Sequence, residues 1–219
     1  LSFDAGTRTF SGTPLNEDVG TIALKVVASD GEASVADTFN LTVTNTNDAP
    51  TLANAISDQT VAEDSALSFQ FASDVFADVD AGDSFTYTAT LSDDSALPSW
   101  LSFDASTRTF SGTPLNEDVG TIALKVTATD SGSASVTDTF NLTVTNTNDA
   151  PTISSTAVTS ATEDSAYSYT IAAGDVDSGD TVTYAATTLP SWLSFDASTG
   201  VLSGTPTNSD VGDHSVVLK

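Results

Sequence analysis

The sequence repeats itself, and this repetition constrains the fold more than any other feature. The run LSFDAGTRTFSGTPLNEDVGTIALKV begins at Leu1 and recurs almost unchanged from Leu101, and LPSWLSFDASTGVLSGTP from Leu189 is a third, more diverged copy. Self-similarity at a fixed period of about 100 residues indicates one structural unit per copy. The chain is therefore expected to be an array of similar modules.

A second repeated motif, TNDAPT, marks the expected boundaries between modules. It runs through Asp48 and Pro50 and returns through Asp149 and Pro151. Proline beside short polar residues suits an extended link between compact units. We expect the C-terminal part of a truncated module in residues 1–49, a complete module in 50–149, and the N-terminal part of a truncated module in 150–219. The chain would then be an excerpt of a longer array, and its partial modules should expose core residues and unpaired strand edges.

Within residues 50–149, apolar side chains alternate with polar ones, which is the period of a β-strand. The clearest runs are 67–71, 85–89, 122–126 and 140–144, and clusters of Asp, Gly, Pro and Ser separate them. No segment carries a convincing apolar face of a helix. This pattern predicts an all-β fold, with a β-sandwich of about seven strands in each module.

Composition limits the kinds of molecule that the chain is expected to bind. The chain has 30 acidic residues against five Lys and Arg, which gives a net charge of -25. Such a surface repels nucleic acid and anionic membranes and attracts cations. No apolar run approaches the roughly 18 to 20 residues of a membrane-spanning helix, so direct membrane insertion is not expected. The chain has no cysteine, which excludes disulfides and thiolate metal sites.

Acidic residues gather in the predicted loops rather than along the strands. Calcium takes six to eight oxygen ligands at about 2.3 to 2.6 Å, and converging acidic loops can supply them. The Asp-x-Asp pattern of Asp78 and Asp80, followed by Gly82 and Asp83, suits that coordination. The alternative is that these are solvated carboxylates that keep a secreted protein soluble. Taken together, the clusters favour Ca²⁺ as the cofactor.

The run WLSFDASTRTFSGTPLNEDVGTIALKVTATDSGSASVTDTFNLTVTNTNDAP, which begins at Trp100, resembles the cadherin repeat, and most closely its bacterial dystroglycan-type, cadherin-like form. The cadherin order F-x-I-D-x-x-T-G, L-D-R-E, V-x-A-x-D and D-x-N-D-N-A-P reappears across the module. The resemblance implies tandem Ig-like or cadherin-like sandwich modules with calcium at each junction. It also implies a large bacterial surface adhesin.

Calcium ligands follow from the resemblance position by position. The junction after residues 50–149 would use Glu63, Asn116, Asp118, Asn146, Asn148, Asp149, Asp175 and Asp177. The earlier junction would use Asn16, Asp18, Asn45, Asn47, Asp48, Asp78, Asp80 and Asp130. The sequence departs from the family pattern, because Asn replaces the leading Asp of the linker, one linker residue is missing, and L-D-R-E has become L-N-E-D. These departures predict one or two ions per junction, with an affinity of about 0.1 to 1 mM.

The expected function is a calcium-rigidified spacer of a secreted or cell-surface bacterial adhesin. Its partners would be calcium ions and the neighbouring repeats of the same chain. The alternative is a carbohydrate-binding module of a surface protein that handles polysaccharide, with polysaccharide or cell-surface ligands as partners. Exposure of Trp100 in a groove would favour the alternative, and burial would favour the spacer. No enzymatic activity is expected, because the sole histidine, His214, has no counterpart in the other copies.

Overall fold

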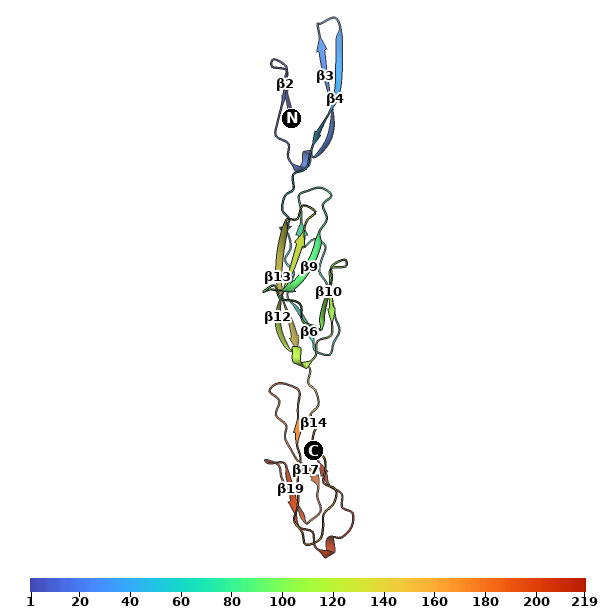
Figure 1. Ribbon diagram of the computed structural model, residues 1–219, viewed down its shortest axis with the longest axis vertical. Helices are drawn as coiled ribbons and strands as arrows, with labels where there is room; N and C mark the ends of the chain where they lie inside the picture. The colour runs from blue at the N-terminus through green and yellow to red at the C-terminus, as the bar shows by residue number, and fades with distance from the viewer. The chain divides into compact units, whose positions relative to one another are not determined.

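The computed structural model describes residues 1–219, which are built almost entirely of β-strands (Figure 1). The strands are β1 (Ser2–Asp4), β2 (Thr9–Ser11), β3 (Gly20–Ser29), β4 (Ser34–Val43), β5 (Thr51–Leu52), β6 (Gln59–Ala62), β7 (Leu67–Gln70), β8 (Phe76–Ala77), β9 (Thr86–Leu91), β10 (Leu101–Asp104), β11 (Thr109–Gly112), β12 (Gly120–Thr129), β13 (Ser135–Thr145), β14 (Thr152–Ile153), β15 (Tyr167–Thr170), β16 (Ala173–Gly174), β17 (Ala186–Thr188), β18 (Leu193–Asp196), β19 (Val201–Gly204) and β20 (Val217–Leu218). Three single-turn 3-10 helices complete the list: η1 (Asn16–Asp18), η2 (Asn116–Asp118) and η3 (Asn208–Asp210). None of the helices has the length and apolar character that a membrane crossing requires.

The chain folds as two compact units, and each is described by itself. The first unit comprises Leu1–Val61, Ser65–Pro114 and Gly120–Thr145. The second unit comprises Ala62–Asp64, Leu115–Val119 and Asn146–Lys219. The linker residues Asn146 to Asp149 therefore fold with the short segments around Glu63 and Asn116.

A seven-stranded sandwich forms the centre of the first unit. Its four-stranded sheet has the order β6-β13-β12-β9, and its three-stranded sheet has the order β10-β11-β7. The long antiparallel pair β12 and β13 places Leu124 opposite Phe140. The predicted all-β sandwich of about seven strands is confirmed, and the predicted alternation falls on these strands.

The core lies between the two sheets. Leu124, Val126 and Ala128 are fully buried on alternate positions of β12, as period-two burial requires. From the opposite sheet, the ring of Phe110 meets the edge of Phe140 at 5.8 Å between centroids. Burying an apolar side chain of this size stabilises the fold by about 1.5 to 3 kcal/mol. The sheets are thus held mainly by these interleaved side chains.

The repeated SGTP motif ends strand β11 at a close approach of two backbones. A Cβ atom on Gly112 would lie 1.9 Å from the carbonyl oxygen of Trp100, and one on Gly204 would lie 2.0 Å from that of Trp192. Only glycine fits at such a distance. The motif is therefore a packing feature of the sandwich.

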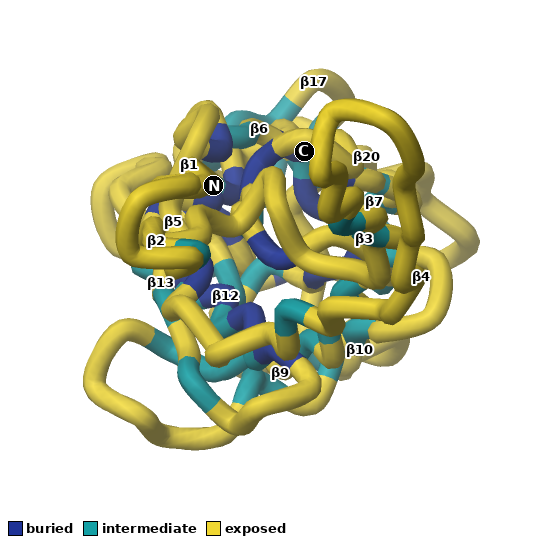
Figure 2. The backbone as a smooth tube through the Cα atoms, turned by 90° about the horizontal axis from the view of Figure 1, so that it is seen from above, coloured by how far each residue is buried: buried dark blue, intermediate teal, exposed yellow.

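Residues 1–43 have nearly the same sequence as β10 to β13 but a different burial. They form the hairpins β1–β2 and β3–β4, which belong to separate sheets. Phe39 and Leu41 are 42% and 36% exposed, whereas their repeat counterparts Phe140 and Leu142 are 4% and 1% exposed. Strands β3 and β4 accordingly run largely in yellow in Figure 2. Burial here depends on the neighbouring strands and not on the strand's own sequence.

The second unit holds three small sheets, with orders β15-β19-β18, β14-β16 and β17-β20. In the first of these, Tyr169 pairs with Leu202, as Phe69 pairs with Phe110 in the first unit. Ile171 and Leu202 are its buried apolar residues. Residues 150–219 thus repeat part of the sandwich, strand by strand.

Candidate metal centres

Three carboxylates of the second unit meet at the linker. The Asp149 cluster consists of Glu63, Asp149 and Asp177, whose ligand oxygens all lie within 4.8 Å of one another. Glu63 is 1% exposed and Asp177 is 5% exposed. Linker N–H groups fix both acids, because Thr147 N donates to Glu63 Oε1 at 2.7 Å and Asp149 N donates to Asp177 Oδ2 at 2.7 Å.

The Asp149 cluster has the donor set that a divalent cation requires. Glu63 Oε2 is buried and accepts no hydrogen bond, which is costly for a carboxylate without a cation. With its nitrogen turned toward the acids, the Asn146 amide donates to Glu63 Oε1 at 3.1 Å and to Asp177 Oδ1 at 3.2 Å. Turned the other way, the same amide would offer a further ligand oxygen. The residues present therefore fit Ca²⁺, which prefers carboxylate and amide oxygens.

Burial and the neighbouring acids act together on the pKa of Asp149. Partial burial, followed by the charges of Asp177, Asp64, Glu63 and Asp175, raises the pKa of the Asp149 carboxyl above its ordinary value. Like charges that face one another disfavour the ionised form. A bound cation would remove this penalty.

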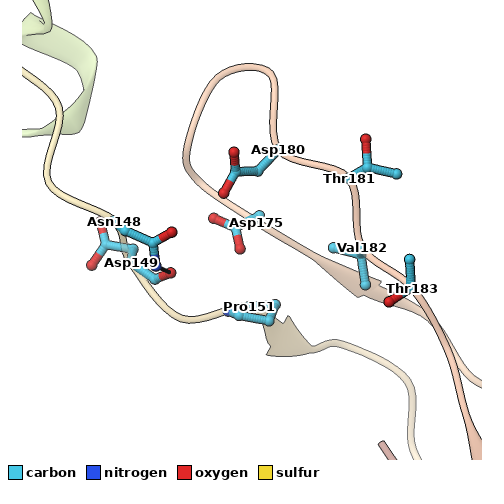
Figure 3. A pocket seen from close by; sticks show the side chains of 8 residues that line it. All are labelled: Asn148, Asp149, Pro151, Asp175, Asp180, Thr181, Val182 and Thr183. Atoms are coloured by element: carbon cyan, nitrogen blue, oxygen red, sulfur yellow. Dashed lines mark hydrogen bonds between the residues drawn. The ribbon is translucent and has the colours of Figure 1, made fainter.

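Asp175 and Asp180 extend the second unit's acidic group beside the linker. Together with Asp177 they place ligand oxygens within 4.8 Å of one another. Figure 3 shows the Asp175 and Asp180 carboxylates on the side of their loop that faces Asn148 and Asp149, across a pocket of about 230 Å³. Asn148 Nδ2 also donates to the Asp149 carbonyl at 2.6 Å. The loop and the linker therefore present oxygen ligands to the same space.

A matching group lies in the first unit. The Asp78 cluster consists of Asp78, Asp83 and Asp130, again with ligand oxygens within 4.8 Å of one another. Asp80 lies beside it and is 7% exposed, and its Oδ2 accepts from Asp48 N at 2.8 Å. One oxygen on each of Asp78, Asp80 and Asp83 is buried without a hydrogen-bond partner.

Linker side chains approach the Asp78 cluster as they approach the Asp149 cluster. Asn47 Nδ2 donates to Asp130 Oδ2 at 3.1 Å. Asn16 Nδ2 donates to Asp48 Oδ2 at 2.8 Å. Asn45 is exposed and makes no hydrogen bond to these residues. The structure therefore brings together most of the residues that the resemblance assigned to this junction, but not Asn45 or Asp18.

Asp18 and Asp118 each accept a hydrogen bond within their own 3-10 helix. Asp118 Oδ2 accepts from Leu115 N at 2.9 Å, and Asp18 makes the same bond to Leu15 N. Each carboxylate closes the first turn of its own 3-10 helix. The turn then positions the preceding asparagine, and Asn116 Nδ2 donates to Asp177 Oδ1 at 3.0 Å. Neither aspartate belongs to an acidic cluster.

Asp83 and Asp180 are the site residues that the position-by-position assignment omitted. A signal for them exists in the sequence, since DVDAGD from Asp78 and DVDSGD from Asp175 repeat the same spacing of three acids. The last acid of each motif lies three residues after the middle one, beyond the glycine. The bend at Gly82, which has φ +89°, returns the chain toward Asp78.

No basic side chain neutralises either cluster. The one salt bridge of the structure joins Lys125 to Asp94, and neither residue belongs to a cluster. The buried acids of both clusters therefore face amide groups, backbone N–H groups and one another.

Strand order, sandwich core and acidic junctions define an all-β, Ig-like or cadherin-like repeat, and comparison with known proteins agrees. The family described as "Putative Ig domain" matches residues 1–44, 49–145 and 150–219, and the chain belongs to this family. The expected resemblance to cadherin-like repeats of adhesins is confirmed.

A relative and two solved structures illustrate the likeness. The serine-rich adhesin for platelets of Staphylococcus aureus is 37% identical over 121 residues, which is 55% of this chain and 5% of that adhesin. Mouse cadherin-23 repeats EC22–24 align with a TM-score of 0.55 at 21% identity, covering 94% of this chain and 71% of that one. The extracellular domain of protocadherin GammaB4 aligns with a TM-score of 0.51 at 21% identity, covering 92% and 36%. At these identities the solved structures show the fold alone.

Proposed function

We propose that the chain is a run of calcium-binding spacer modules from a secreted or cell-surface bacterial adhesin. The modules would be residues 1–49, 50–149 and 150–219, a division supported by the three matched segments of the family. The adhesin context is supported by the staphylococcal relative. The observation that carries the calcium proposal is the unpartnered oxygen of the buried Glu63 within a group of three carboxylates.

Hydrogen bonds within the chain fix the position of the linker only in part. Backbone N–H groups of Thr147 and Asp149 bind Glu63 and Asp177, but the acids repel one another. For Glu63 and Asp177, two buried charges about 5 Å apart at an effective dielectric of about 20 repel by roughly 3 kcal/mol. Bound Ca²⁺ would supply the missing positive charge and join the linker oxygens to those of the flanking loops.

Rigidity is the mechanical consequence. A short linker of polar residues and one proline is a flexible tether when its contacts are broken. With its carboxylates and amides held by one ion, the same segment cannot bend without losing ligands. Calcium would therefore set the stiffness of the array, and the proposed function requires no active site.

The packing of Trp100 supports the spacer over the carbohydrate-binding alternative. Trp100 is half-buried and packs against the sandwich core. Its backbone is also pinned by the close approach of Gly112. This packing supports a core-anchoring role for the tryptophan of the complete module.

Calorimetric titration of the 219-residue chain with calcium tests the proposal. We expect saturable binding with a Kd of about 0.1 to 1 mM, weakened at least tenfold for one class of site in Glu63→Gln and in Asp177→Asn. The matched control is Glu163→Gln, because Glu163 is the exposed repeat counterpart of Glu63 and belongs to no acidic cluster. Equal binding by Glu63→Gln and Glu163→Gln would refute the assignment.

A further inference from the structure

Asp138 is a buried carboxylate that the acidic clusters do not include. It is 7% exposed, and it lies on the same face of β13 as the buried side chains of Phe140 and Leu142, where strand alternation favours an apolar residue. No basic side chain neutralises it, since the one salt bridge joins Lys125 to Asp94. Burying a carboxylate is costly unless hydrogen bonds satisfy it. The partners of Asp138 therefore indicate why a charge is present at this position.

Asp138 ties the segment between β5 and β6 to the last strand of residues 50–149. Its Oδ2 accepts from Ile56 N at 2.6 Å, and its Oδ1 accepts from the N–H of the next residue at 2.9 Å. The side chain of Ile56 is buried as well. Three residues earlier, Ala53 N still donates to Val75 O, beside β8. The carboxylate therefore holds the chain at the point where it leaves β8 and joins β13.

Further side-chain hydrogen bonds continue the contact between these two parts of the chain. Asp58 accepts at both oxygens from Asn141, from the backbone N at 2.7 Å and from Nδ2 at 3.3 Å. Thr145 Oγ1 donates to Val61 O at 3.4 Å. In chain order the bonded pairs are Ile56 with Asp138, Asp58 with Asn141, Val61 with Thr145, and Glu63 with Thr147. Both numbers rise together, so β6 and β13, which are neighbours in the sheet, run parallel.

The parallel direction of the β6–β13 pair determines how a pulling force acts on it. The chain reaches the start of the pair at Ile56 and leaves its far end after Thr145. Tension along the chain therefore pulls the two strands lengthwise in opposite directions, and the bonds between them share the load. If the two strands were antiparallel, both pulling points would lie at the same end, and the bonds would break one after another at a lower force.

We propose that residues 50–149 are a load-bearing module whose resistance to stretching lies in the β6–β13 pair, with Asp138 and Asp58 as the side chains that lock the pair. Both carboxylates accept from backbone N–H groups across the pair, and such charge-assisted bonds are stronger than neutral ones. The inference rests on the proposed spacer function for the source of the tension. It requires no calcium, because neither aspartate belongs to an acidic cluster.

Single-molecule stretching of the 219-residue chain in chelator tests the direction of loading. The chain has no cysteine of its own, so a pair of introduced cysteines defines the two pulling points. Ala49→Cys with Ala150→Cys, both exposed, loads the β6–β13 pair lengthwise. Ala49→Cys with Ser135→Cys pulls both strands at the end where the pair starts and peels them apart. At the same force, unfolding should be at least roughly tenfold slower in the lengthwise geometry, the equivalent of one charge-assisted bond.

Variants of the two aspartates test the locking side chains. Asp58→Ala removes an exposed side chain, so the fold should be retained. Its loss should raise the lengthwise unfolding rate about tenfold to a hundredfold and change the peeling rate much less. Asp138→Asn keeps a carbonyl acceptor for Ile56 N but loses the charge, so its lengthwise rate should rise less than that of Asp58→Ala. Asp74→Ala is the matched control, an exposed acid of the same module outside the β6–β13 pair, and should change neither rate.

Three outcomes would overturn the proposal. The first is an equal unfolding rate in the two pulling geometries. The second is the same effect of Asp58→Ala in both geometries, which would show that its bonds contribute to general stability and not to resistance against lengthwise load. The third is equal behaviour of Asp58→Ala and Asp74→Ala. Because the stretching is done in chelator, a failure of calcium binding and a failure of the load-bearing pair are observed separately.

Discussion

Replacing Glu63 by glutamine should stabilise the second unit in chelator and remove most of its response to calcium. Glu63 and Asp177 are both buried and place oxygens within 4.8 Å of each other. Removing one charge relieves a repulsion of roughly 3 kcal/mol, and the remaining carbonyl oxygen of the glutamine still accepts the bond from Thr147 N. For a unit of this size, about 1 kcal/mol shifts the Tm by roughly 4 to 8 °C, so the Tm should rise by roughly 10 °C or more.

Calcium should act on the unsubstituted chain in the same direction. At about 5 mM calcium and a Kd of about 0.5 mM, one site contributes roughly 1.4 kcal/mol, or a rise of roughly 5 to 10 °C. Glu63→Gln should show less than half of this shift, and Glu163→Gln should show all of it. Differential scanning calorimetry in chelator and in calcium measures both effects. A lower Tm for Glu63→Gln in chelator, or a full calcium shift in that variant, would refute the reasoning.

Three further predictions follow from single contacts. Asp83→Asn and Asp180→Asn should each weaken calcium binding several-fold by calorimetric titration, because each acid completes a group of three, whereas Asp104→Asn should not. Ser106→Ala should raise the pKa of Asp104 measured by NMR, since the side-chain hydrogen bond from Ser106 is the main cause that lowers this pKa. The stability that this bond contributes to the folded state is present above the unfolded pKa of about 3.9. It is lost as the pH falls through the lower pKa of the folded state. Gly112→Ala should destabilise the first unit by about 1 to 3 kcal/mol or more in denaturant titration, while Gly174→Ala, whose Cβ would meet no atom within 4 Å, should be close to neutral.

The sequence determined the architecture of residues 50–149 well, because alternation and repetition act together. Phe140, Leu142 and Val144 lie two residues apart and are all buried, as strand geometry requires. The same pattern in β4 predicts the same strand but not its burial. Phe39 lacks the opposing sheet that covers Phe140. Alternation within β4 does not report this, whereas the comparison of the repeats, which predicts exposed core residues in 1–49, does. Alternation therefore predicts which side chains can be buried together, and topology determines which of them are.

The candidate site was predictable where ligands come from repeated motifs and less so where a turn intervenes. Asp78, Asp80 and Asp130 were assigned by position, and the structure places them within one group of acids and linker contacts. Asp118 was assigned in the same way, yet its carboxylate closes the η2 turn. The motif alone does not specify this bond to Leu115 N, which occupies one of the two oxygens of the carboxylate. The assignment of calcium itself stays a proposal.

The acids of this chain differ in their surroundings, and this difference bears on the solubility alternative. Exposed acids such as Asp104 and Asp196 accept hydrogen bonds from the residues just after them, which lower their pKa values. Their charges are satisfied locally, so they need no cation and suit a solubility role. Asp149 has a raised pKa because of burial and the facing charges of Asp177 and its neighbours. Glu63 and Asp177 are buried beside Asp149 at the linker, where neutralisation would also restrict bending, and solubility alone gives no reason for acids to be gathered and buried there.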